Sequence, residues 1–164
     1  MNSQQPAGDW TLDHEGSSIG FRARDFFGFK VTGQFERYDS AFAFGATAAE
    51  SSISLTVWTD SIQTGNKRRD GHLRSGNVFA SACIPTFEFQ STAIIETPTG
   101  LDLTGTLRIR DVTRIVEFHA ARTTGPDAPR YTAELVVAPK DYGITRRGAT
   151  KPLTALIDAT LQRA

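Results

Sequence analysis

The chain has 164 residues and a mass of 17.9 kDa, which is the size of one ordinary domain. Hydrophobic residues make up 39% of it and charged residues 22%, a composition that excludes a disordered chain and a bundle of membrane-spanning helices. Lys and Arg total 18, as do Asp and Glu, and the resulting net charge of zero argues against a general nucleic-acid binder.

The N-terminal segment has neither a basic stretch nor an apolar one, so it does not resemble a secretory signal. We therefore expect a cytoplasmic protein, or a periplasmic or secreted one if a leader has been removed. Residues 1–9 are expected to be disordered or loosely held, and 10–164 to form one domain. The single Cys83 excludes an intrachain disulfide framework and a metal centre built from cysteines.

Apolar and polar residues alternate with a period of two through most of the chain, which predicts antiparallel strands with one buried face. The predicted strands are 17–24, 31–35, 52–58, 86–90, 101–109, 116–120, 131–137 and 153–159. Short strands at this spacing favour a sandwich or a barrel, and a closed barrel leaves no strand edge exposed. Residues 66–75 lack the alternation and are dense in charge, so we expect one short helix there, capped by Asn66 or Thr64. The predicted fold is all-β: a single antiparallel β-barrel with one short helix.

Phenylalanine is abundant on the predicted inward faces, for example at Phe21 and Phe89. A barrel of about eight strands either fills with side chains or holds one slender ligand. Composition leaves both interpretations open: the rings pack as a solid core, or they line an apolar tube in which each buried CH₂ of a lipid is worth about 0.8 kcal/mol. Gly33 and Gly105 also fall on inward faces, where they indicate a bend, a bulge or room for another group.

The segment 61–75, SIQTGNKRRDGHLRS, is the most specific motif of the chain. Together with 85–89 and 105–113 it resembles the YceI-like family, and the resemblance extends from Trp10 to the closing strand. It implies a lipocalin-like barrel that binds a polyisoprenoid chain, such as a polyprenyl lipid or a prenylated quinone.

On this resemblance we predict non-covalent binding, storage or transport of a long isoprenoid lipid, with no enzymatic activity, no metal and no other cofactor. Strand parity assigns seven side chains to the apolar lining: Phe21, Phe35, Phe87, Phe89, Leu103, Leu107 and Ile109. Arg69 and His72 are expected at the mouth of the barrel, near the headgroup of the lipid.

The polar candidates also have structural interpretations. Asp70 and Arg69 can pin the helical segment to strand ends, and His119 shares the polar face of its strand with Glu117. An Asp70/His72 pair could instead serve a small hydrolase or isomerase, although no nucleophile elbow or glycine-rich phosphate loop accompanies it. A filled barrel could act as a protein-interaction module. A homodimer is also possible, since closed symmetric pairs are the commonest oligomers.

Overall fold

The computed structural model describes residues 7–24, 28–76, 81–123, 129–144 and 151–164. Its strands are β1 (Gly8–Leu12), β2 (Ser18–Arg24), β3 (Lys30–Phe35), β4 (Tyr38–Phe44), β5 (Ser52–Trp58), β6 (Ile62–Gln63), β7 (Thr86–Thr97), β8 (Gly100–Ile109), β9 (Val112–Thr123), β10 (Arg130–Val137) and β11 (Leu153–Arg163). The helices are α1 (Lys67–Leu73) and the 3-10 turns η1 (Ala48–Glu50), η2 (Thr59–Ser61) and η3 (Pro139–Tyr142).

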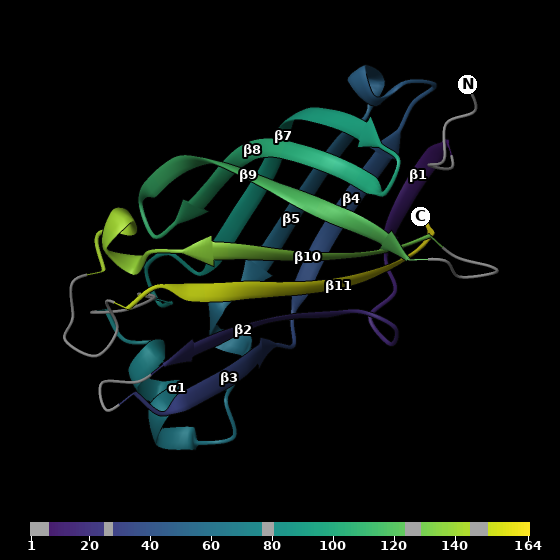
Figure 1. Cartoon of the computed structure of the whole chain (residues 1–164). Helices are drawn as coiled ribbons and strands as arrows, with labels where there is room; N and C mark the ends of the chain where they lie inside the picture. The colour runs from purple at the N-terminus through teal and green to yellow at the C-terminus, as the bar shows by residue number, and fades with distance from the viewer. Residues whose placement is uncertain (1–6, 25–27, 77–80, 124–128, 145–150) are drawn as a thin grey trace.

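Eight of these strands form a closed antiparallel barrel in the order β1-β4-β5-β7-β8-β9-β10-β11, which confirms the predicted architecture (Figure 1). The ring closes where β11 pairs with β1, Trp10 lying opposite Arg163. Strands β7 to β11 follow one another as a meander, and each pairs with the next. Strands β2, β3 and β6 continue the sheet from β11 as a flap, and α1 follows β6 in the chain.

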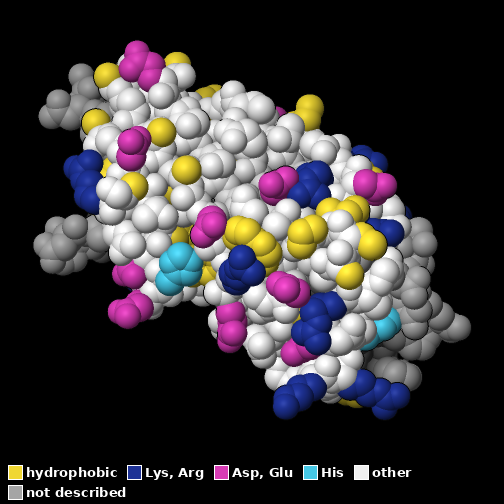
Figure 2. Space-filling model, turned by 180° about the vertical axis from the view of Figure 1, so that it is seen from behind, with side chains coloured by type: hydrophobic (Ala, Val, Ile, Leu, Met, Phe, Trp, Pro, Cys, Tyr) yellow, Lys and Arg dark blue, Asp and Glu magenta, His cyan; other side chains and the backbone are white. Residues whose placement is uncertain are grey.

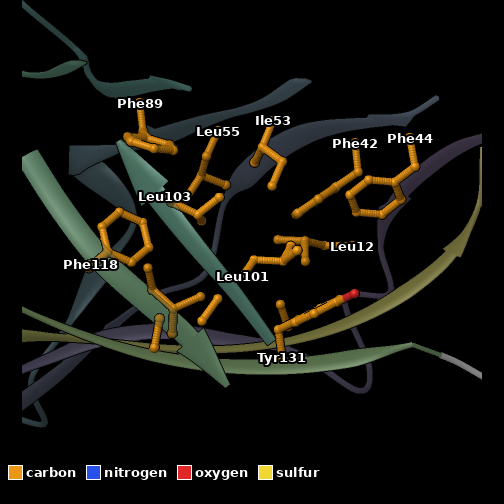
Figure 3. A pocket seen from close by; sticks show the side chains of 14 residues that line it. Leu12, Phe42, Phe44, Ile53, Leu55, Phe89, Leu101, Leu103, Phe118 and Tyr131 are labelled. Atoms are coloured by element: carbon orange, nitrogen blue, oxygen red, sulfur yellow. The ribbon is translucent and has the colours of Figure 1, made fainter. Parts of the chain in front are cut away.

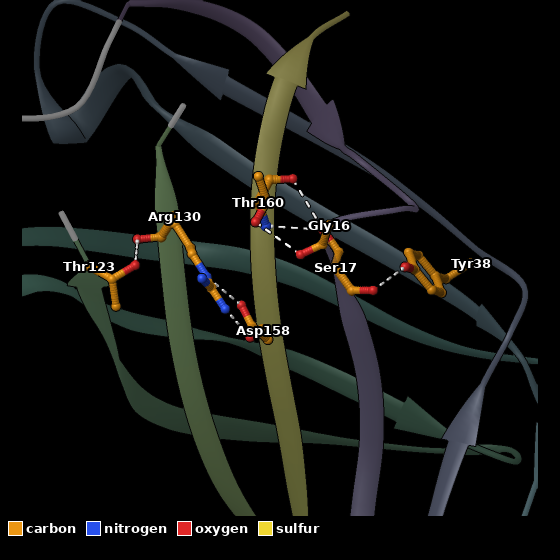
Figure 4. A network of polar contacts seen from close by, with 7 residues as sticks. All are labelled: Gly16, Ser17, Tyr38, Thr123, Arg130, Asp158 and Thr160. Atoms are coloured by element: carbon orange, nitrogen blue, oxygen red, sulfur yellow. Dashed lines mark hydrogen bonds and ion pairs between the residues drawn. The ribbon is translucent and has the colours of Figure 1, made fainter. Parts of the chain in front are cut away.

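A bend at residues 13–17 lets a single strand, β11, pair with both β1 and β2. The backbone N–H of Thr160 donates to the hydroxyl of Ser17 (3.0 Å), and that hydroxyl donates back to the carbonyl of Thr160 (3.1 Å) (Figure 4). The Thr160 hydroxyl donates to the carbonyl of Gly16. These bonds pair the backbone N–H and carbonyl groups at the point where β11 changes from pairing with β2 to pairing with β1. The flap and the barrel therefore share one continuous sheet.

The two ends of the barrel differ. The end that holds α1, η3 and the start of β7 is called the helix end here. The end that holds β1, the β7–β8 turn and Arg163 is called the termini end (Figure 1). Strand β1 already begins at Gly8, opposite Phe44, within the segment expected to be loosely held. Residues 1–6 of that segment lie outside the described part of the chain.

Interlocking aromatic rings occupy the helix end. The rings of Phe21 and Phe35 are 6.1 Å apart, and the ring of Phe87 meets Phe35 edge-on at 5.6 Å. Such edge contacts add to the free energy gained from burying the rings. Phe21, Phe35 and Phe87 are called the aromatic layer below. In this half of the barrel the interpretation of a solid core holds.

The two inward-facing glycines are covered by these and similar rings. A Cβ atom at Gly33 would lie 2.6 Å from the ring of Phe21, its cross-strand partner. A Cβ at Gly105 would lie 2.5 Å from the ring of Phe89 and 2.4 Å from the carbonyl oxygen of Gln90. Gly105 also faces Ser91, where the β7–β8 register shifts. The bulge expected there is confirmed, but the room left by the missing side chains is filled by phenyl rings rather than left for a ligand.

The outer surface carries both signs of charge. On the face shown in Figure 2, basic and acidic side chains are interspersed, and neither forms a continuous patch. Paired charges include Arg130 and Asp158, whose guanidinium and carboxylate meet at 2.6 Å between β10 and β11 (Figure 4). None of the helices in the described ranges is long and apolar enough to cross a bilayer.

Candidate functional site

The barrel encloses an apolar cavity of about 60 Å³ (Figure 3). Its fourteen lining residues are Leu12, Phe42, Phe44, Ile53, Leu55, Phe89, Leu101, Leu103, Phe118, Ala120, Tyr131, Ala133, Ile157 and Ala159. They come from all eight strands of the barrel, and their side chains point toward one another across it. The cavity is therefore the interior of the barrel rather than a surface groove.

The cavity lies in the termini-end half of the barrel. Along β8, Leu101 and Leu103 line it, whereas Leu107 and Ile109, further toward the helix end, do not. Along β7, Phe89 lines it and Phe87 does not. One half of the interior is thus filled and the other is hollow, so neither sequence-based interpretation describes the whole barrel.

Small residues on one wall create the cavity. Ala120 on β9 lies directly opposite Ala133 on β10, and Ala159 on β11 lies opposite Tyr131. The facing strands β4, β5 and β7 contribute Phe and other large side chains (Figure 3). The strands that carry these three alanines are held in place by hydrogen bonds to their neighbours, so their backbone cannot move inward. The volume that larger side chains would fill therefore stays empty.

The predicted lining is only partly at the cavity. Of the seven candidates, Phe89 and Leu103 line it. The other five lie outside it: Phe21, Phe35 and Ile109 are buried in the core, and Phe87 and Leu107 are partly buried against that core. Reasoning from the sequence concentrated on large residues and passed over the inward-facing alanines, although period-two parity would have identified them.

The cavity is small. Its volume of about 60 Å³ holds about four to six water-sized groups, which corresponds to about one isoprene unit of five carbons. Pockets for drug-sized ligands usually measure roughly 300–1,000 Å³. A long lipid chain therefore requires side chains of the interior, foremost the rings of the aromatic layer, to move as it enters.

The predicted headgroup residues lie on α1, at the helix end. The guanidinium of Arg69 donates to the hydroxyl of Thr64 (3.0 Å) and to its carbonyl oxygen (3.1 Å). Asp70 is 5% exposed, and its carboxylate accepts from the backbone N–H of Thr64 (3.0 Å) and from its hydroxyl. His72 is exposed. None of the three lines the cavity, and Arg69 and Asp70 are engaged in holding α1 to the end of β6.

The family model of the YceI-like domain matches residues 10–162. The chain belongs to the YceI-like family. A protein named YceI from Escherichia coli is 30% identical over 147 residues, which covers 84% of this chain and 77% of the relative. A protein of Pseudomonas aeruginosa, named UPF0312 protein, is 29% identical over 150 residues, which covers 86% of this chain and 78% of the relative.

Solved structures share the YceI-like fold. BcnA of Burkholderia cenocepacia superposes with a TM-score of 0.83 at 16% identity, over 92% of this chain and 99% of that one. A structure described as a polyisoprenoid binding domain from Saccharophagus degradans, implicated in plant cell wall breakdown, superposes with a TM-score of 0.69 at 16% identity, over 93% of this chain and 98% of that one.

In this YceI-like chain, the motif at 61–75 builds the β6–α1 corner. Asn66 caps the helix, its side-chain oxygen accepting from the N–H of Arg69 at 3.1 Å, and α1 spans Lys67–Leu73 within the 66–75 segment predicted to be helical. Leu73 packs against the core. The motif thus explains how the helix closes onto the flap, through Asn66 for the cap and Asp70 for the attachment.

Replacing Asp70 with alanine is expected to lower the free energy of unfolding by about 2–3 kcal/mol, because the N–H and hydroxyl of Thr64 lose a charged acceptor in a buried position. Urea denaturation measures the change. Asp60→Ala is the matched control: Asp60 is exposed in η2, and its replacement should stay within about 0.5 kcal/mol of the wild type. Equal losses in the two variants would contradict the anchoring role of Asp70.

His119 of this YceI-like barrel lies on the outer face, as predicted. Its ring is hydrogen-bonded through Nδ1 to the carboxylate of Asp102 (2.7 Å) and through Nε2 to the hydroxyl of Thr99 (3.1 Å). The His119 side chain is 39% exposed and that of Asp102 is 56% exposed. The three groups form a solvated cluster at the β7–β8 turn, outside the cavity.

Proposed function

We propose that the barrel binds an isoprenoid lipid non-covalently, as a carrier or store, and performs no chemistry on it. The observation that carries the proposal is the apolar cavity inside the barrel, whose fourteen lining residues include no charged side chain. Its surroundings suit a branched hydrocarbon chain better than any polar substrate. The likeness in fold to a polyisoprenoid binding domain supports the same function.

The energetics of the cavity also favour occupation. An empty cavity of about 60 Å³ costs about 1.4 kcal/mol at roughly 24 cal/mol per Å³. Each isoprene unit that enters gains on the order of 4 kcal/mol, since each buried carbon contributes about 0.8 kcal/mol. A phenyl ring that turns away from its preferred rotamer while staying inside the barrel costs about 0.5–1.5 kcal/mol. A chain of several units therefore has enough free energy to displace the aromatic layer.

The enzymatic alternative receives no support from the geometry around Asp70. General acid–base work needs a carboxylate within reach of a bound substrate. The Asp70 carboxylate instead accepts a hydrogen bond from Thr64, the residue is 5% exposed, and it lies outside the cavity lining. His72, its proposed partner, is exposed on the other side of the same short helix segment.

The test is to identify what the protein carries. The chain is purified without detergent, extracted with organic solvent and analysed by mass spectrometry. We expect an isoprenoid at about one molecule per chain, and after delipidation we expect uptake of an added polyprenol. Recovery of solvent and buffer components alone, together with no uptake of polyprenol, would refute the proposal and leave a barrel whose interior serves only folding.

A further inference from the structure

Strands β9 and β10 pair over only part of their length. Four residue pairs join them, and the last of these is Ala120 with Ala133. Beyond it, within the described part of the chain, residues 112–119 of β9 pair only with β8, and residues 134–137 of β10 pair only with β11. Figure 1 shows the two strands diverging toward the helix end. The stretch of wall between these two unpaired segments is called the split here.

The split has a defined limit at each end. It begins at Ala120 and Ala133, which also line the cavity. Toward the helix end, Nε of Arg114 on β9 donates to the carbonyl oxygen of Asp141 in η3 (2.8 Å), and Val137 of β10 is buried. The split is therefore a bounded window in the barrel wall, and its upper edge is part of the cavity lining.

The burial of the inward-facing side chains changes where the split begins. Ala120 and Ala133, in the last residue pair, are buried. Past that pair, Val116 and Phe118 on β9 and Leu135 on β10 are only partly buried, although all three pack against the core. Phe118 also lines the cavity. An apolar surface thus continues from the cavity into the split.

No hydrogen bonds between β9 and β10 seal the wall at the split. Strand edges that lack a ladder partner take their hydrogen bonds from water. A chain that crosses a paired stretch of the wall must break several backbone hydrogen bonds at once. A chain that crosses the split only has to turn side chains to other rotamers. The split is therefore a place where the barrel can admit a slender ligand while its strand pairing stays intact.

Exposed apolar side chains flank the split on the outer surface. Ile115 on β9 is 76% exposed, and Val136 on β10 is 69% exposed. A single exposed apolar residue is common and needs no explanation. These two, however, lie on opposite rims of one opening whose inner side is also apolar. Such a rim suits contact with hydrocarbon better than contact with water.

We propose that the split is the portal through which an isoprenoid chain enters the barrel from a lipid surface, with Ile115 and Val136 in contact with that surface. The inference rests on the proposed function, since it requires the barrel to bind an isoprenoid. A chain that passes directly from one apolar environment to another avoids exposing its carbons to water. The end that enters first reaches the cavity beside Ala120 and Ala133.

The first experiment bridges the split. Glu117 and Val136 each lie three residues beyond the last β9–β10 pair, and both are exposed. Both are replaced with cysteine in a chain that also carries Cys83→Ser, because Cys83 is free and exposed. A short bis-methanethiosulfonate reagent then joins the two thiols, and mass spectrometry confirms the bridge. We expect uptake of a fluorescent polyprenol from phosphatidylcholine vesicles to slow at least about tenfold, and dithiothreitol, which cleaves the bridge, to restore the rate.

The matched control is a bridge across an intact ladder. Val136 and Thr154 are cross-strand partners of β10 and β11. Val136→Cys with Thr154→Cys, bridged by the same reagent, should take up the polyprenol at the same rate before and after cleavage of the bridge. Slowing equal to that of the Glu117–Val136 bridge would overturn the portal, because it would not depend on the split.

The second experiment tests the contact with the lipid surface without a cross-link. A chain with Ile115→Asp and Val136→Asp should take up the polyprenol from vesicles about threefold to tenfold more slowly. The amount bound at equilibrium should not change, because neither side chain lines the cavity. Ile95→Asp is the matched control: Ile95 is 62% exposed on β7, which does not border the split, and its replacement should change neither quantity. Melting temperatures verify that the variants are folded.

The outcomes separate this inference from the proposed function. If the wild-type chain takes up no polyprenol, either from vesicles or from ethanol added to the solution, the proposed function fails. If it binds polyprenol but the bridged chain and the double Asp variant keep the wild-type rate, the portal is overturned and isoprenoid binding stands. A bridge that slows uptake while the Asp substitutions do not overturns the contact of Ile115 and Val136 with the lipid surface.

Discussion

Replacing Gly105 with alanine is expected to destabilise the barrel by about 3 kcal/mol, a large share of the stability of a domain of this size. The added Cβ would lie 2.4 Å from the carbonyl oxygen of Gln90 and 2.5 Å from the ring of Phe89. The first contact is with a backbone atom of β7, so the added carbon fits only if the β7–β8 pairing shifts near its bulge. Such a shift would break hydrogen bonds between the two strands. Guanidinium denaturation of wild type and variant measures the loss.

The matched control is the same substitution at Gly71, in the interior of α1. A Cβ there would have its nearest side-chain neighbour, the guanidinium of Arg74, at 3.9 Å, and alanine is a better helix former than glycine. Gly71→Ala should therefore raise stability by about 0.5–1 kcal/mol. A Gly105→Ala variant that unfolds at the wild-type denaturant concentration would show that Phe89 and the β7 backbone do not pack against this glycine as described.

Replacing Ala133 with leucine is expected to reduce isoprenoid uptake at least tenfold. The three added carbons enter the cavity beside Ala120, its cross-strand partner, and occupy most of the room for about four to six water-sized groups. Because the space is empty without ligand, the lipid-free variant should be as stable as wild type or more stable by about 1 kcal/mol. Uptake of a labelled polyprenol and thermal unfolding measure the two effects.

Ala41→Leu is the matched control for this prediction. Ala41 lies on β4 with its side chain exposed on the outside of the barrel, and its replacement should change neither uptake nor stability appreciably. Ala133→Val, with a smaller addition, should give an intermediate loss of uptake. Wild-type uptake by a stably folded Ala133→Leu protein would show that the lipid does not occupy this cavity.

Reasoning from the sequence identified the fold because strand parity is a local property. The alternation around Phe21 and Phe89 correctly places both side chains in the core, and the absence of alternation at 66–75 correctly predicts α1. Parity specifies a face of the sheet but not a height along the barrel. Whether Phe87 or Phe89 meets the cavity depends on how eight strands are staggered, and this stagger is set by long-range pairing that no short segment encodes.

The position of the cavity also depends on what lies opposite each residue. Ala120 and Ala133 are unremarkable in their own strands, and they matter because the β9–β10 register places them side by side. Conversely, Arg69 and Asp70 stand out in the sequence because they belong to a specific motif, yet their hydrogen bonds go to Thr64, six or fewer residues away.

The ring closes through its shortest strand. Three residue pairs join β1 to β4 and three join it to β11, whereas ten join β8 to β9. Amide hydrogens in the β1–β4 and β1–β11 pairings, called the seam here, should therefore exchange with deuterium when β1 alone detaches. They should exchange well before those of β8 and β9. Leu12 of β1 also lines the cavity, so detaching this one strand would expose the interior sideways while the meander stays intact. A lipid could then leave through the wall of the barrel, at a rate set by fraying of the seam and not by unfolding.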